Sequence, residues 1–125
     1  MEVERPDPQA DKNLMTFVVA SFVVEGIHCW PECPLEEVSF LRSPHRHLFF
    51  FRMRKAVTHD DRDVEIIMLA RAAKLFIQQT HPTVDGCSDF GRQSCEMLAQ
   101  KVLAMFDCDA VEVLEDNENG AVVTK

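Results

Sequence analysis

Hydrophobic and polar positions along the chain predict two long strands in its first half. Residues 14 to 27, "LMTFVVASFVVEGI", are rich in β-branched and aromatic side chains on both faces, which predicts a strand covered on both sides. Residues 45 to 57, "HRHLFFFRMRKAV", alternate in their second half, with Phe51 and Met53 on one face and arginines on the other. The prolines of "CWPECP" end the first strand, and residues 35 to 44 form a connection or a short irregular strand.

A helical period replaces the strand period in the second half. Residues 67 to 79 repeat apolar side chains at helical spacing and predict an amphipathic helix. Residues 80 to 93 contain Pro82 and two glycines, which predicts a long loop. A second amphipathic helix follows over residues 94 to 106, with Ser94 as its N-cap.

The chain ends in a predicted hairpin. "AVEVLE", residues 110 to 115, is expected to be a strand, Asn119-Gly120 has favoured turn chemistry, and "AVVT" is the returning strand. The order is therefore ββααββ. Strands and helices grouped in blocks predict an α+β domain, in which two helices cover one face of an antiparallel four-stranded sheet.

The length of the chain predicts one domain. Residues 14 to 125 are long enough to bury about two thirds of their unfolded surface. Residues 1 to 13 are charged, contain two prolines and show no periodicity, so we expect a flexible leader. The first apolar run is too short to cross a bilayer, and no secretory signal is visible, which predicts no membrane association.

Charge and cysteine content narrow the functional classes. A formal net charge of −8 disfavours general binding to nucleic acid, although eight of the thirteen basic residues lie between Arg42 and Lys74. A basic rim for a small anionic ligand therefore stays open beside the simpler interpretation of a mixed, solvated surface. Five cysteines at irregular spacing do not form a complete disulfide framework, which favours a reducing, cytoplasmic setting.

Three histidines carry the strongest chemical signal. His45 and His47 are two residues apart in a predicted strand, so they share one face, while His28 ends the other long strand. If the two strands pair antiparallel, all three imidazoles meet at one edge of the sheet. Three neutral imidazoles and one open position are typical of catalytic zinc, so Zn²⁺ is the expected cofactor.

Two other interpretations of these histidines stay open. Cys29 and Cys33 with His45 and His47 loosely match a Cys2His2 structural site, although the histidine spacing is wrong for that class. The histidines are alternatively ordinary core or interface groups without a ligand, in which case the protein is structural.

The order of the motifs resembles that of the 6-pyruvoyltetrahydropterin and 6-carboxytetrahydropterin synthases. The matching segments are "FVVEGIH", "HRHLFFFRMR", "EIIMLARAAKLF", "QSCEMLAQKVL" and "AVEVLED", in that order, and the resemblance covers residues 15 to 124. The resemblance implies the T-fold, a ββααββ unit that oligomerises into a barrel. It also implies zinc at the histidine trio, and it implies that Glu115 anchors the ring N–H groups of a pterin or deazapurine-like base.

The chain departs from the family in its acid–base residues. The position of the family's catalytic cysteine is Leu41, so Cys33 or Cys29 would have to fold back toward the site. His81 and Asp85 are possible replacements for the family's Asp-His pair. His59-Asp60-Asp61 is another candidate relay, and its simpler description is a charged turn.

Two functional hypotheses follow from this resemblance. The first is a zinc-dependent lyase of the pterin or deazapurine type, which acts on a nucleotide-derived heterocycle. The second is an oligomeric protein that binds a base or nucleotide without turning it over, with Arg46 and neighbouring arginines receiving phosphates. Under either hypothesis the exposed edges of the sheet predict a homo-oligomer.

Overall fold

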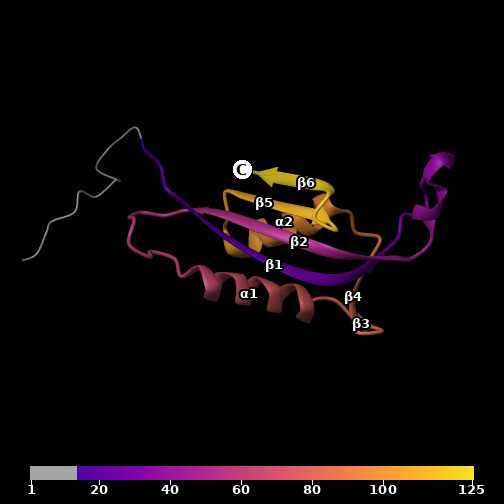
Figure 1. The fold of residues 1–125 in the computed structure, drawn as a ribbon, viewed down its shortest axis with the longest axis horizontal. Coiled ribbons are helices and arrows are strands. Elements are labelled where there is room, and N and C mark those ends of the chain that lie inside the picture. Colours follow the sequence, from indigo (N-terminus) through magenta and orange to yellow (C-terminus); the bar gives the residue numbers. More distant parts are fainter. Residues whose placement is uncertain (1–13) are drawn as a thin grey trace, which may run out of the picture.

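The computed structural model describes residues 14–125, so the predicted leader at residues 1 to 13 lies outside the described part. Two long strands, β1 (Phe17–His28) and β2 (His45–Ala56), pair antiparallel along their whole length and cross the molecule in Figure 1. They are connected through a segment of 3₁₀ turns, Glu36–Arg42, which projects beyond the sheet at one end. Both long strands were predicted.

The remaining helices and strands follow β2 along the chain. They are α1 (Ile66–Gln79), β3 (Thr83–Val84), β4 (Cys87–Gly91), α2 (Cys95–Phe106), β5 (Ala110–Glu115) and β6 (Asn119–Thr124). The strand order is β3-β4-β1-β2-β5-β6. Among the described residues, no helix has the length and apolar character needed to cross a membrane.

The prediction of a four-stranded antiparallel sheet is wrong in strand number and in one pairing. The sheet has six strands, and β4 runs parallel to the end of β1. The segment that was expected to be a loop forms the β3–β4 hairpin, whose two-residue turn is Asp85-Gly86. Both turn residues have positive φ, which matches the turn type that a tight hairpin requires.

The turn between β5 and β6 also differs from the prediction. Asn119 and Gly120 pair with Glu115 and Leu114 as part of β6, so they are not the turn. Asp116 and Asn117 take the left-handed conformation instead, with φ of 53° and 60°. Aspartate and asparagine tolerate this region better than other residues with a side chain.

One face of the sheet carries the core. Phe22 of β1 lies opposite Phe51 of β2, which lies opposite Val113 of β5, so these side chains share a face. They form one buried cluster with Ile77 of α1 and Leu98 of α2. Both helices therefore cover the same face of the sheet, as predicted.

Candidate metal centre

The pairing of β1 with β2 brings the three predicted histidines together. His28 is the direct partner of His45, and Gly26 is the partner of His47, so all three imidazoles project from the helix-covered face. On β2 they continue the inward-facing row that Phe49 and Phe51 begin. The ring centroids lie 4.6 Å apart for His28 and His45 and 5.1 Å apart for His45 and His47.

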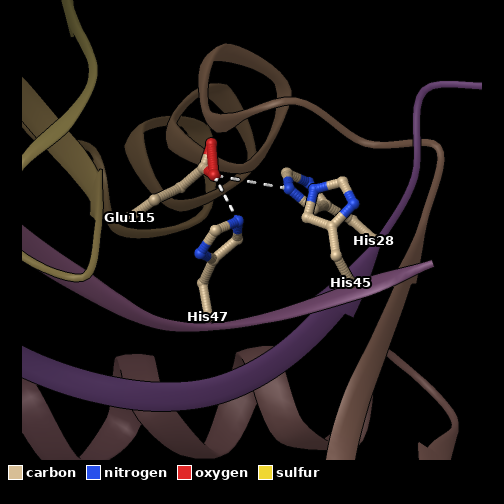
Figure 2. A group of neighbouring side chains, drawn as sticks. All are labelled: His28, His45, His47 and Glu115. Atoms are coloured by element: carbon tan, nitrogen blue, oxygen red, sulfur yellow. Dashed lines mark ion pairs between the residues drawn. The ribbon is translucent and has the colours of Figure 1, made fainter. Parts of the chain in front are cut away.

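Glu115 completes the cluster from the end of β5. Its Oε2 lies 2.8 Å from His47 Nε2 and 3.6 Å from His28 Nε2. Figure 2 marks these two ion pairs with dashed lines. The four residues offer one ligand atom each, and all four atoms lie within 4.8 Å of one another. A tetrahedral ion with bonds of about 2.0–2.1 Å holds its ligand atoms roughly 3.3 Å apart. The group could therefore hold a metal ion after small movements of the side chains.

The outer nitrogen of each imidazole is already bound to an oxygen acceptor. Nδ1 of His28 lies 2.9 Å from the Gln93 carbonyl oxygen, and Nδ1 of His45 lies 2.8 Å from the Ser43 carbonyl oxygen. Nδ1 of His47 lies 2.7 Å from Asp116 Oδ2. Because a carbonyl or carboxylate oxygen accepts a hydrogen bond and cannot donate one, each Nδ1 carries the hydrogen. When it is neutral, each ring then directs the lone pair of Nε2 toward the common point, which is how metal-bound histidines are oriented.

Two of these inner nitrogens lack a hydrogen bond. His45 Nε2 and His47 Nε2 are buried and have no hydrogen-bond partner; the close approach of Glu115 to His47 does not have hydrogen-bond geometry. Buried polar atoms without partners are costly in folded proteins. A cation at the centre would satisfy both nitrogens at once.

Charges within the cluster act on one another. Burial alone disfavours the charged form of His28, but the hydrogen bond and the charge of Glu115, together with the Gln93 carbonyl, raise the pKa of His28 above its usual value. The hydrogen bond with His28, followed by the charges of the neighbouring imidazoles, lowers the pKa of Glu115 despite its burial. The carboxylate is therefore ionised and suited to a cation or to N–H donors.

A cavity of about 420 Å³ opens beside the cluster. His28, His45 and Glu115 form one wall, and Trp30 with Leu41 forms another. The first turn of α2 also lines the cavity, from Ser94 to Met97. A small organic ligand can thus lie in contact with the metal position.

The thiol of Cys95 faces Glu115 at this wall. Its Sγ lies 3.8 Å from Glu115 Oε1, and burial together with the negative charge of Glu115 raises the pKa of Cys95 to about 12. The thiol is therefore protonated near neutral pH and donates toward the carboxylate. Because it resists deprotonation, Cys95 is a poor nucleophile.

The residues predicted to be catalytic lie away from the cavity. His81 is buried behind the site, with Nδ1 2.7 Å from the Ile77 carbonyl oxygen and Nε2 2.9 Å from the Gln93 amide nitrogen. Asp85 is exposed in the β3–β4 turn. Cys33 is buried, its Sγ lies 3.8 Å from the Leu35 carbonyl oxygen, and it does not line the cavity. His81 therefore supports Gln93, whose carbonyl oxygen in turn holds His28.

The other residues that the sequence suggested also lie outside the metal-binding group. Arg46 points to the opposite face of the sheet, where it pairs with Glu25 at 3.1 Å. His59 lies in an exposed loop after the far end of β2 and pairs with Asp63. Cys29 lines the cavity, but neither it nor Cys33 joins the metal-binding group, so the alternative Cys2His2 set is not formed.

Sequence reasoning missed the residues that hold the imidazoles in place. Gln93 and Asp116 are 65 and 69 positions from the histidines that they contact. Both lie in segments predicted to be loops or turns. The one available signal was Asp116 itself, an acidic residue directly after the predicted ligand Glu115.

No protein-family model matches the chain, and no curated protein matches it significantly.

Proposed function

We propose that the protein holds a zinc ion through His28, His45 and His47 and takes a small heterocyclic ligand into the adjoining cavity. The observation that carries this proposal is the convergence of three Nε2 atoms whose partner Nδ1 atoms are all bound to oxygen acceptors. An arrangement of this kind prepares all three rings in the same tautomer for a metal ion.

Zinc is the ion that suits these donors best. Three imidazoles with one further position are typical of catalytic zinc, and a bound zinc ion polarises an oxygen of its ligand or acidifies a water molecule. The chain supplies the rest of the site. The cavity beside the cluster gives the ligand its place, and the protonated Cys95 thiol orients the Glu115 carboxylate.

Glu115 is the proposed anchor for the ligand. Its carboxylate is ionised, about half buried and part of the cavity wall, so it can accept paired N–H groups from an amino-substituted ring. The motif order similar to 6-pyruvoyltetrahydropterin and 6-carboxytetrahydropterin synthases supports a pterin or deazapurine-like base. We therefore propose a lyase of this type, which moves a proton or eliminates a side-chain group next to a polarised oxygen.

Proton transfer in such a reaction needs a titratable group in the cavity. Cys29 lines the cavity next to His28 and is better placed for this role than Cys33, Asp85 or His81. Leu41, at the position where the resembling family has its cysteine, lines the same cavity.

Metal analysis of the purified protein tests the proposal. We expect one zinc ion per chain, and we expect a His45→Ala/His47→Ala variant to lose it, because the remaining groups cannot hold a tetrahedral ion. His59→Ala is the matched control, since His59 lies in an exposed loop and should leave the zinc content unchanged. Protein without stoichiometric zinc, or equal metal content in all three proteins, would contradict the proposal.

A second function, ligand binding without turnover, is favoured by one observation. The side chains predicted to transfer protons, His81 and Asp85, lie outside the cavity. Incubation with pterin triphosphates and nucleotides, followed by mass spectrometry of the recovered ligand, separates the two functions. Altered ligand supports the lyase, whereas intact ligand at high occupancy supports the binding protein.

A further inference from the structure

Asp116 contacts the metal cluster through His47 and does not line the cavity. We propose that Asp116 is a positioning residue, which fixes His47 in the tautomer and orientation needed to bind the metal ion. This inference rests on the metal-binding part of the proposed function and does not depend on the identity of the heterocycle.

Both carboxylate oxygens of Asp116 form hydrogen bonds with residues near the start of β2. Oδ2 lies 2.7 Å from His47 Nδ1, and Oδ1 accepts the backbone N–H of Leu48 at 3.0 Å. The backbone N–H of Asp116 in turn donates to the Leu48 carbonyl oxygen at 2.7 Å. One residue therefore holds the ring of His47 and the strand segment that carries it.

An unusual backbone conformation makes this arrangement possible. Successive residues of a regular strand point to opposite faces, so Asp116 would be directed away from Glu115 if β5 continued. Its φ of 53° ends the strand instead and allows the side chains of Glu115 and Asp116 to reach the same imidazole. Glu115 Oε2 lies 2.8 Å from Nε2 of that ring, and Asp116 lies at Nδ1.

Asp116 differs chemically from the other two acceptors. His28 and His45 donate to neutral backbone carbonyls, whereas His47 donates to a carboxylate. A charged acceptor forms the stronger hydrogen bond and makes the opposite ring nitrogen a better metal ligand. Among the three imidazoles, His47 is therefore the one whose metal affinity a side-chain substitution can change without altering the ligand itself.

Asp116→Asn is the most informative substitution, because asparagine keeps the size of the side chain and tolerates positive φ. Its amide has one acceptor and one donor, while His47 Nδ1–H and Leu48 N–H both require acceptors. If the amide nitrogen faces His47, the ring proton moves to Nε2 and blocks the metal position. If the amide turns over, the Leu48 N–H loses its partner.

The test measures zinc affinity by chelator competition and the visible spectrum of the cobalt-substituted protein. We expect Asp116→Asn to weaken zinc binding roughly 10- to 100-fold and to change the cobalt spectrum, because a displaced imidazole alters the ligand field. Glu118→Gln is the matched control, since it removes one charge from the same exposed turn. It should keep wild-type affinity and spectrum.

A second variant keeps the test decisive if Asp116→Asn does not fold. Asp116→Gly retains positive φ without steric cost and removes the carboxylate, so it should also weaken zinc binding. Wild-type affinity and cobalt spectrum in a folded Asp116 variant would overturn the positioning role and leave the metal site intact. Absence of zinc binding by the wild-type protein would overturn the proposed function together with this inference.

Discussion

Glu115 is the residue on which the proposed metal and ligand sites meet. Its Oε2 faces the imidazoles, its Oε1 faces the Cys95 thiol, and its side chain forms part of the cavity wall. Loss of its negative charge should weaken ligand binding and leave zinc binding in place. Three imidazoles are sufficient to hold zinc when water takes the fourth position.

We expect Glu115→Gln to retain stoichiometric zinc and to bind a pterin or deazapurine ligand at least about tenfold more weakly. An amide offers one acceptor where a carboxylate offers two, and it carries no charge for paired N–H donors. Zinc content and ligand titration measure the two effects separately. Glu112→Gln, earlier on the same strand and distant from the cavity, is the control that should leave both unchanged. Loss of zinc with unchanged ligand affinity would reverse the roles assigned to Glu115.

The shifted pKa values of His28 and Glu115 predict a pH dependence of stability. The raised pKa of His28 gives the metal-free protein stability that is present below about pH 6.5 and is lost as pH rises through the folded-state pKa. The lowered pKa of Glu115 gives stability that is present above about pH 4.5 and is lost as pH falls through its folded-state pKa. The ion pair therefore stabilises the metal-free protein in the mildly acidic range.

Bound zinc should stabilise the protein more as the pH rises, because protons compete with the ion for the imidazoles. We expect chelation to lower the unfolding temperature more at about pH 8 than at about pH 5.5, where protons compete more strongly with the ion for its ligands. Thermal unfolding with and without chelator at both pH values measures this difference. An equal effect of chelation at both would show that the histidines do not bind the ion.

At the scale of the elements, the parallel strand β4 supports the site from one side. It pairs with the last residues of β1, and the chain after it carries the Gln93 carbonyl to His28. The ring of Phe90 on β4 packs directly against Gly26 of β1. A Cβ atom at Gly26 would lie 2.4 Å from Phe90 and 2.8 Å from Phe49, which is closer than contacting atoms allow. Glycine is therefore required for β4 to approach β1.

We expect Gly26→Ala to destabilise the protein by about 1–3 kcal/mol, because the added methyl group displaces a buried aromatic ring. Denaturant unfolding measures the change. Ser21→Ala, on an exposed position of the same strand, should change stability by less than about 0.5 kcal/mol. Equal stability of Gly26→Ala and the wild-type protein would mean that β4 is not packed against β1 in this way.

At the scale of the whole molecule, the sheet has open edges. In the described part of the chain, β4 pairs only with residues 26 to 28 of β1, so the earlier residues of that strand form one edge, and β6 forms an edge on the other side. Exposed apolar side chains lie at both, including Val19 and Val122. Unpaired strand edges of this length favour association with another strand.

We therefore expect self-association in which β6 of one copy pairs with β1 of the next, as barrel closure would require. Light scattering of the purified protein should give a mass that is a multiple of 14.3 kDa. The four residues of the metal cluster all come from one chain, so zinc binding should survive dilution to the monomer. A monomer at high concentration would contradict the proposed association.

The sequence by itself determined the inward face of the second long strand but not that of the first. The first was predicted to be covered on both sides, whereas only one of its faces is buried and Val19 on the other is exposed. The alternation in the second half of residues 45 to 57 put Phe51 and Met53 on one face, and the spacing of His45 and His47 put these two on a common face, because strand geometry repeats every two residues. The structure shows that both pairs face inward. The positions of the two helices and the final strand pair were predicted for the same reason. Local periodicity depends only on near neighbours in the chain.

Only the tertiary structure decided which distant groups contact the histidines. The β3–β4 hairpin was predicted as a loop, and its position places Gln93 under His28, while the conformation of Asp116 places a carboxylate against His47. The same packing put Cys29 in the cavity and directed Arg46 and Cys33 elsewhere. These outcomes depend on contacts between residues far apart in the chain, which no local pattern encodes.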